Sequence, residues 1–325
     1  MSATSFFHRS VLLDEVLEAF ETISDGLIVD CTLGLGGHSE ALLTAKQGIC
    51  LLGIDRDLVA IKCAEERLAT FGNRFQTAHS DFRNLSNILV EKELQEKPLN
   101  AILLDLGVSS MQLDTPTRGF SFQQEGPLDM RMDFSQGETA ADIVNSFSEE
   151  ELANLIYEYG EEPASRAIAR VIVDNRETKP INTTMELAAL VTKAVNFRER
   201  KMGRKIDSKR IHPATRTFQA LRIAVNRELT NLDKFIGTAI DLLAPKGRLA
   251  VISFHSLEDR IIKNAYRFAT GACQCPPRLP KCICGAKKKV TILTKKPLVA
   301  SEIESKTNPR ARSAKLRVCE KINSL

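Results

Sequence analysis

The sequence predicts an α/β protein with a mostly parallel, Rossmann-like sheet and an inserted helical domain. Apolar runs that end in an acid alternate with helical patterns over residues 26–105, which is typical of strand-helix-strand units in a parallel sheet. Helical patterns alone then follow, and the apolar run Leu249–Ile252 resumes the sheet. We therefore expect a discontinuous sheet domain, 1–110 and 212–325, with the helical domain 111–211 inserted between its fourth and fifth strands.

Composition restricts the class of protein. The chain has 325 residues, of which 43% are hydrophobic and 26% charged, as in an ordinary globular protein long enough for two domains. No apolar run approaches the roughly 20 residues of a membrane span, and no signal peptide opens the chain, so we expect no membrane partner and a cytoplasmic protein. With a net charge of only +4, any nucleic-acid surface must be a local patch.

The first strand and the turn after it form the main motif. The apolar run before Asp30 leads to Gly34, Gly36 and Gly37, a helical pattern follows, and the next apolar run ends at Asp55. This is the plan of a nucleotide-type cofactor site at the carboxyl edge of a parallel sheet. The glycines let backbone approach a ligand, and Asp55 is positioned to accept hydrogen bonds from ribose hydroxyls. Glycines in such a turn also serve plain packing, and that alternative stays open.

The residues beside the turn discriminate between cofactors. Asp30 and Thr32 put an acid and a hydroxyl next to the ligand. Asp30 would repel the two phosphates of NAD, whereas it tolerates the cationic amino-acid end of S-adenosylmethionine. We therefore favour S-adenosylmethionine as the cofactor.

Two further strands end in acids. Asp81 and Phe82 follow the third strand, where they either bind adenine or serve as a helix cap and a core residue. Asp105 ends the fourth strand. Because the carboxyl ends of parallel strands share one edge, we expect Asp30, Asp55 and Asp105 to converge on one crevice. Asp105 lies by position where a transferred methyl group should meet its acceptor.

The inserted region predicts a nucleic-acid partner. Capping boxes at Ser148 and Thr183 begin two of its helices. Its exit is basic, and such a run is either a solvated face or a loop that binds a polyanion. A long helix from about residue 213 to 243 follows, with polar residues on one face, and His212 before it is more typical of a cap than of a general base. The candidate RNA-binding residues are Arg204, Lys205, Lys209, Arg210, Arg216 and Arg222.

The last part of the chain completes the sheet and adds a cysteine cluster. Ser253 or Ser256 is expected to cap the helix after the fifth strand, and residues 314–320 alternate as a closing strand. Four cysteines lie close in sequence, namely Cys273, Cys275, Cys282 and Cys284. Structural zinc sites usually space cysteines as C-x2–4-C, so the tighter C-x-C pairs favour a reduced loop or a redox-sensitive pair over zinc. Metal binding stays open.

Several motifs together resemble one family. They are His8–Glu15, Gly34–Ser39, Asp105–Ser110, Gly119–Phe122, Gly126–Asp133, His212–Ala220, Ser253–Arg260 and Asn308–Ser313. In this order, over almost the whole chain, they resemble the bacterial small-subunit ribosomal RNA methyltransferase H family, also called MraW. The cysteine segment departs from family members that lack it.

The resemblance implies an S-adenosylmethionine-dependent enzyme that methylates the exocyclic N4 of a cytidine in the decoding region of small-subunit ribosomal RNA. It also implies a class I methyltransferase fold with a helical insertion, the RNA of the small ribosomal subunit as partner, and leaves a homodimer open. Carried over by motif, the cofactor-binding residues are Gly36, Gly37, His38, Asp55, Phe82, Asp105 and Gln112.

Asp105 is also the candidate catalytic residue. Its carboxylate, or the backbone after it, would accept the hydrogens of the cytidine amino group and localise the nitrogen lone pair. Three other functions fit parts of this pattern, namely an NAD-dependent oxidoreductase, a non-catalytic RNA-binding or assembly factor, and a DNA amino-methyltransferase. The last commonly carries a proline-rich tetrapeptide after the fourth strand, where this chain has Asp105-Leu-Gly-Val.

Overall fold

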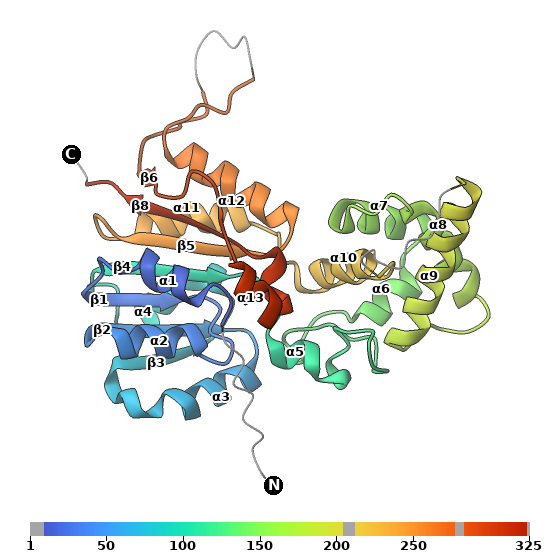
Figure 1. The fold of residues 1–325 in the computed structure, drawn as a ribbon, viewed down its shortest axis with the longest axis horizontal. Helices are drawn as coiled ribbons and strands as arrows, with labels where there is room; N and C mark the ends of the chain where they lie inside the picture. Colours follow the sequence, from blue (N-terminus) through green and yellow to red (C-terminus); the bar gives the residue numbers. More distant parts are fainter. Residues whose placement is uncertain (1–9, 204–211, 277–282, 324–325) are drawn as a thin grey trace. The chain divides into compact units, whose positions relative to one another are not determined.

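The computed structural model describes residues 10–203, 212–276 and 283–323. It divides into two compact units (Figure 1): the first comprises Met1–Gly107 and Asn231–Leu325, and the second Val108–Thr230. The expected return to the sheet domain at residue 212 differs from this division, because the helix that follows packs within the second unit.

The first unit is built on one eight-stranded sheet with the order β3-β2-β1-β4-β5-β8-β6, and β7 pairs with β8. Strands β1 to β5 are parallel to one another, while β8 is antiparallel to β5. This is the mostly parallel Rossmann-like sheet that the sequence predicts. The strands are β1 (Asp25–Asp30), β2 (Gly48–Asp55), β3 (Phe75–His79), β4 (Leu99–Asp105), β5 (Arg248–Ser253), β6 (Val290–Ile292), β7 (Leu298–Val299) and β8 (Lys315–Lys321).

Helices pack on this sheet. The α-helices of the first unit are α1 (Leu13–Ala19), α2 (Gly37–Ala45), α3 (Leu58–Leu68), α4 (Leu85–Glu91), α11 (Leu232–Leu242), α12 (Ser256–Ala269) and α13 (Glu302–Thr307). Three short 3-10 helices cover Ala69–Arg74, Phe82–Asn84 and Pro309–Ser313. Val16, Leu42 and Leu68 of the first three α-helices join the same buried cluster as Ile28 and Leu103 of the central strands. Burying these side chains removes apolar surface from water and fixes the helices on the sheet.

The second unit is helical. Its helices are α5 (Ser110–Asp114), a 3-10 turn (Pro116–Arg118), α6 (Ala140–Ser146), α7 (Glu149–Gly160), α8 (Ser165–Arg176), α9 (Thr184–Lys201) and α10 (Thr215–Asn226). The predicted capping boxes are confirmed at Ser148 and Thr183, each of which accepts the amide of a glutamate three residues later. No helix in the described parts of the chain is both long and apolar enough to cross a membrane.

Helix α10 attaches to α7 through polar contacts. Gln219 Nε2 donates to the carbonyl of Tyr159 at 3.0 Å, and Arg216 Nη1 donates to the carbonyl of Glu161 at 3.3 Å. Gly160 permits this approach, because a Cβ there would lie 2.6 Å from the Arg216 carbonyl oxygen. The polar face that the sequence predicted for this helix is therefore largely an internal contact within the second unit.

The prediction of a single long helix over residues 213–243 is wrong. Helix α10 ends at Asn226, and α11 begins at Leu232. Arg227 and Asn231 between them take positive φ angles of 50° and 56°, which an α-helix cannot contain. Helical periodicity on both sides concealed this break, and the second compact unit ends within it, at Thr230.

Candidate active site at the carboxyl edge of the sheet

Three carboxylates lie at one edge of the sheet, as the sequence predicted. Asp30, Asp55 and Asp105 are the last residues of β1, β2 and β4, which are adjacent in the order β2-β1-β4. They are close enough to affect each other electrostatically: the charge of Asp55 raises the pKa of Asp30, and that of Asp30 raises the pKa of Asp105. The edge therefore concentrates negative charge in a poorly solvated place.

Asp30 holds the glycine turn from beneath. Its side chain is 1% exposed, and its Oδ2 accepts a hydrogen bond from Ser39 Oγ at 2.8 Å, while Oδ1 accepts the Thr32 amide at 3.2 Å. Burial raises its pKa to about 6, against the lowering effect of these hydrogen bonds. Asp30 was expected beside the cofactor, but its burial gives it a structural role, and it acts on a ligand only through its charge.

The turn requires glycine at its different positions for different structural reasons, namely backbone conformation or lack of space for a Cβ. Gly34 and Gly36 take positive φ angles of 51° and 76°, and Gly36 immediately precedes α2. At Gly37 a Cβ would lie 2.2 Å from Ser10 Oγ, which occupies that space. The packing explanation left open by the sequence thus applies at Gly37, where the neighbour is a side chain of the same unit.

Asp55 joins the turn to the second strand. Its Oδ2 accepts the Gly34 amide at 2.8 Å and its Oδ1 accepts the Asp57 amide at 2.9 Å. Burial raises its pKa, although both backbone hydrogen bonds oppose that change. Since each carboxylate oxygen has two lone pairs, both oxygens can still accept from a ligand hydroxyl.

His38 is the most unusual group at this edge. The residue is 7% exposed, and among the described residues neither ring nitrogen has a hydrogen-bond partner. Its Nε2 lies 3.8 Å from Asp105 Oδ2. Burial lowers its pKa to about 4, so the ring is neutral near pH 7. A buried polar atom without a partner costs free energy, which makes His38 a candidate ligand contact.

Asp105 is fixed through its backbone and leaves its carboxylate near the edge. Its amide donates to Thr32 Oγ1 at 2.6 Å, and its Oδ1 accepts the Gly107 amide at 3.4 Å. The side chain is 23% exposed. Burial, followed by the charges of Asp30 and Glu258, raises its pKa to about 7. A carboxyl group that titrates near neutrality can exchange a proton with a substrate at working pH.

Asp81 and Phe82 follow β3. Phe82 is 8% exposed and meets Phe235 of α11 edge to face, with ring centroids 4.6 Å apart. Asp81 accepts the Arg83 amide at 2.9 Å and thereby caps the short 3-10 helix that begins at Phe82. The capping and packing roles considered from the sequence are both present, while a contact with adenine stays a prediction.

A histidine cap beside this edge was not predicted from the sequence. His255, and neither Ser253 nor Ser256, is the N-cap of α12, in a capping box with Glu258. Glu258 is 1% exposed, and its Oε2 accepts the Phe254 amide at 2.8 Å. The signal was a glutamate three residues after His255, but serines are so common at caps that they took precedence.

Gln112 lies in α5, in the second unit. The residue is 5% exposed, and it forms a capping box at the start of α5: its Oε1 accepts the Ser109 amide at 3.1 Å, and its own amide donates to Ser109 Oγ at 3.2 Å. Its role toward the cofactor stays a prediction.

The candidate RNA-binding residues divide into three groups. Four of them, Arg204, Lys205, Lys209 and Arg210, lie outside the described residues. Arg222 makes a two-pronged ion pair with Glu228, with Nε and Nη2 2.9 and 2.8 Å from its carboxylate oxygens, and its side chain is 16% exposed. Arg216 is 52% exposed and lies 3.8 Å from Glu162. Of the two described arginines, Arg216 is the one accessible to a phosphate.

Comparison with known proteins gives the family. The sequence model of the MraW methylase family matches residues 5–322. Proteins named ribosomal RNA small subunit methyltransferase H are similar over nearly their whole length. The one from Carboxydothermus hydrogenoformans is 47% identical over 98% of this chain and 99% of its own. The one from Trichlorobacter lovleyi is 49% identical over the same shares of the two chains. This chain therefore belongs to the MraW methylase family.

Proposed function

We propose that this chain transfers a methyl group from S-adenosylmethionine to the exocyclic N4 of a cytidine in the decoding region of small-subunit ribosomal RNA. One observation carries the proposal: three strand-end carboxylates lie beside a glycine turn and a buried histidine whose ring nitrogens have no hydrogen-bond partner among the described residues. Membership of the MraW methylase family and the names of its relatives support the choice of reaction and substrate.

The charge of the site fits this cofactor. When bound, S-adenosylmethionine supplies an electrophilic methyl group on a sulfonium, and it also carries an ammonium group. Asp30 and Asp105 have raised pKa values because burial leaves their ionised forms without sufficient compensation. A cationic ligand provides that compensation, whereas a pyrophosphate would increase the repulsion. His38, neutral at pH 7, offers a hydrogen bond without adding positive charge.

The adenosyl part is assigned to the other strand ends. Asp55 accepts hydrogen bonds from the ribose hydroxyls, with the lone pairs that the two backbone amides leave unused. The ring of Phe82, held by Phe235, borders the adenine. Gly36 and Gly37 are assigned to the cofactor through their backbone, since a Cβ at either would meet the protein itself, Leu68 at Gly36 and Ser10 at Gly37.

Asp105 acts on the methyl acceptor. The amino nitrogen of cytosine is a poor nucleophile because its lone pair is delocalised into the ring. A carboxylate that accepts a hydrogen bond from this amino group localises the lone pair on nitrogen. The nitrogen loses one proton as it gains the methyl group, and Asp105, with its pKa near 7, can take that proton.

The RNA must present a single extruded base, as enzymes that act on a base within nucleic acid require. We assign phosphate binding to Arg216, which is exposed, together with Arg204, Lys205, Lys209 and Arg210 outside the described residues. A ribosomal substrate also implies that the chain works in the cytoplasm.

Sedimentation of the purified chain distinguishes a monomer from a homodimer.

The test is labelled-methyl transfer with the purified chain, using assembled small ribosomal subunits and naked small-subunit RNA as separate substrates. Nucleoside mass spectrometry of the product should find N4-methylcytidine, and mapping should place it in the decoding region. Transfer to a different nucleoside would overturn the substrate assignment. Binding of S-adenosylmethionine without any transfer to either RNA would favour the non-catalytic RNA-binding factor.

A further inference from the structure

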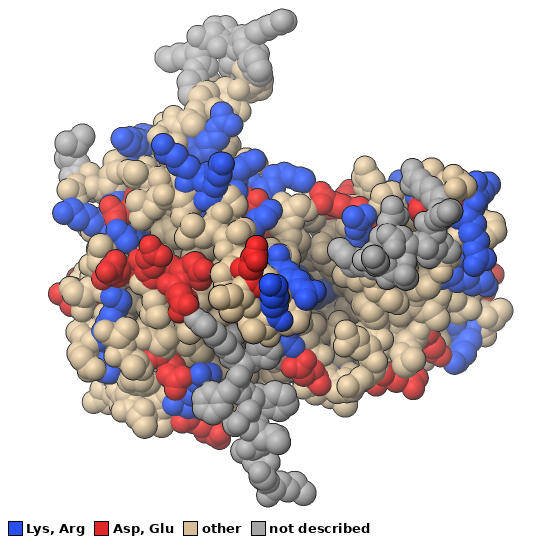
Figure 2. Space-filling view, viewed as in Figure 1, with Lys and Arg blue, Asp and Glu red and all other residues tan. Residues whose placement is uncertain are grey.

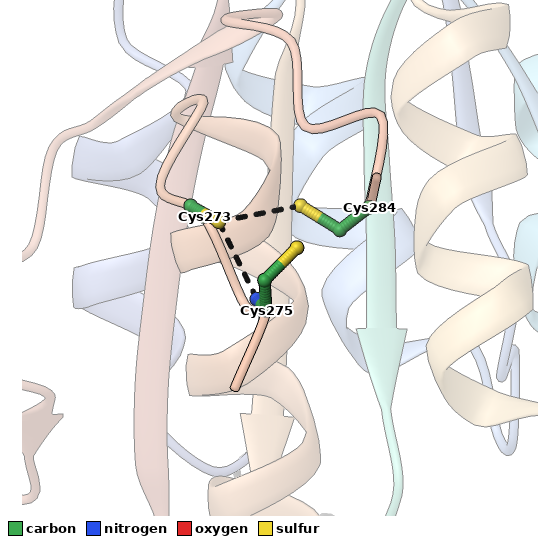
Figure 3. Close-up of side chains that lie close together, drawn as sticks. All are labelled: Cys273, Cys275 and Cys284. Carbon is green, nitrogen blue, oxygen red and sulfur yellow. Dashed lines mark hydrogen bonds between the residues drawn. The ribbon is translucent and has the colours of Figure 1, made fainter. Parts of the chain in front are cut away.

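Three cysteine sulfurs converge in the segment between α12 and β6, far in sequence from the carboxylate edge. The Sγ atoms of Cys273, Cys275 and Cys284 all lie within 4.8 Å of one another. Figure 3 shows the sulfur of Cys284 directed toward Cys273, while the sulfur of Cys275 points toward that of Cys284, which comes from a separate stretch of chain. Cys282, the fourth cysteine of the motif, lies outside the described residues, and the site defined here does not include it.

We propose that these three thiolates bind a zinc ion. In a tetrahedral site with Zn–S bonds of about 2.3 Å, neighbouring sulfurs are about 3.8 Å apart. The Sγ atoms of Cys273 and Cys284 are 3.7 Å apart, which already matches such an edge. The spacing argument that disfavoured zinc concerned neighbours in sequence, whereas the third sulfur here comes from across the loop.

Backbone hydrogen bonds prepare two of the sulfurs for negative charge. The Cys275 amide donates to Cys273 Sγ, and the Ile283 amide donates to Cys275 Sγ, each at 3.4 Å. Such N–H···S contacts stabilise a thiolate and orient it toward a metal. A disulfide joins only two sulfurs and gives no reason for the third to lie within reach.

The base of the segment and its charge also fit a metal site. The Lys289 amide donates to the Ala269 carbonyl at 2.7 Å, and Thr270 forms a β-bridge with Lys288, so the two ends of the segment are held together. Figure 2 shows Lys and Arg side chains gathered on the part of the first unit that carries α12 and the segment before β6. Lys287 and Lys288 are exposed there. Zinc with three thiolates has a net negative charge, which these lysines offset.

Zinc binding changes only the protonation of the thiols. Each thiol that is protonated before the metal arrives releases its proton to solvent, and no oxidant or reductant is needed. The zinc links Cys273 and Cys275, which follow α12, to Cys284, which precedes β6. The proposal does not depend on methyl transfer, because it rests on a different part of the first unit.

The test is metal analysis of the full-length chain, purified under reducing conditions without a metal-affinity tag. We expect about one zinc ion per chain. Cys273→Ser and Cys284→Ser should each reduce zinc content at least tenfold. Cys63→Ser, at an exposed cysteine of α3, is the matched control and should leave zinc content unchanged.

A second measurement on the unaltered chain guards against variants that fail to fold. Zinc is removed with a chelator and replaced by Co²⁺, whose thiolate complexes have an intense charge-transfer band in the near ultraviolet. We expect this band, and its loss when zinc is added back. Absence of both zinc and the cobalt band would overturn the proposal. So would a Cys273–Cys284 disulfide, found by mass spectrometry in the freshly isolated chain.

Discussion

The amide of Asp105 donates a hydrogen bond to the hydroxyl of Thr32, with N and Oγ1 2.6 Å apart. This bond joins the carboxyl end of β4 to the first residues of the glycine turn after β1. The two motifs that the sequence presents 73 residues apart therefore hold each other in position. This contact positions Asp105 through its backbone. Replacing the Asp105 side chain therefore keeps the contact and tests the role of the carboxylate in the reaction.

Replacing Asp105 with Asn or Ala should reduce methyl transfer by at least a hundredfold, because general acid-base catalysis contributes about 10²–10⁴-fold. Steady-state kinetics with small ribosomal subunits measures the loss. Asp174→Asn, at an exposed acid of α8, is the control and should be fully active. Retained activity of both Asp105 variants, with unchanged cofactor affinity, would remove Asp105 from the mechanism.

The raised pKa of Asp105 also predicts a dependence of stability on pH. The folded-state pKa is about 7, and in the unfolded chain an aspartate titrates near pH ~3.9, so between these values only the native state keeps the proton. Stability from this group is therefore lost as pH rises from about 4 to 7. Asp105→Asn cannot ionise and should escape that loss.

Thermal unfolding at pH 5 and pH 8 tests this expectation. The midpoint of Asp105→Asn minus that of the unaltered chain should be more positive at pH 8 than at pH 5. An equal difference at both pH values would mean that Asp105 titrates normally.

His38→Leu separates a ligand contact from a structural role. Leu removes two buried nitrogens that have no partner among the described residues, so the ligand-free chain should be as stable as before, or more stable. Cofactor affinity should fall roughly tenfold, the effect of about one lost hydrogen bond. Calorimetric titration with S-adenosylhomocysteine measures the affinity. Lower stability with undiminished affinity would make His38 a structural residue.

In the glycine turn, a second substitution should restore the properties that a first one impairs. Gly37→Ala should weaken cofactor binding and lower the unfolding midpoint, because the new Cβ would lie 2.2 Å from Ser10 Oγ. Ser10→Ala in the same chain removes that oxygen and should restore both properties. Gly36→Ala should not be rescued in this way, since its φ of 76° strains any side chain. A Gly37→Ala chain that is not improved by Ser10→Ala would contradict the packing explanation.

The two described arginines of α10 should behave differently toward RNA. Arg216→Ala should lower the slope of log affinity against log salt by about 1, as expected for one lost phosphate contact. Arg222→Ala should leave that slope unchanged and destabilise the second unit, because it removes the Arg222–Glu228 ion pair. Binding measurements over a range of salt concentrations compare the two. Equal slopes for Arg216→Ala and the unaltered chain would exclude Arg216 from the RNA surface.

Much of the sheet could be predicted because three buried strands appear in the sequence as apolar runs that each end at an acidic residue. The runs before Asp30, Asp55 and Asp105 each became a parallel strand that ends at its acid. The capping boxes at Ser148 and Thr183 were equally legible, since both partners lie within one helical turn.

What failed depended on contacts between distant residues. The break between α10 and α11 is set by backbone angles at Arg227 and Asn231 that no periodicity reports. The polar stripe on α10 resembled an RNA-binding face, yet Gln219 bonds the Tyr159 carbonyl inside the unit. The burial of Asp30 beneath the turn, and the space that Ser10 occupies beside Gly37, likewise follow from tertiary packing.

The order of strands has a consequence for synthesis on the ribosome. Strand β4 ends at Asp105, and its neighbour β5 begins at Arg248, after the whole helical unit. At about 5–20 residues per second, the nascent chain carries an unpaired β4 edge for roughly 6 to 25 seconds while residues 108–230 emerge and fold. Such an edge invites pairing with other chains. A translational pause before β5 should therefore promote aggregation, whereas a pause after β8 should not.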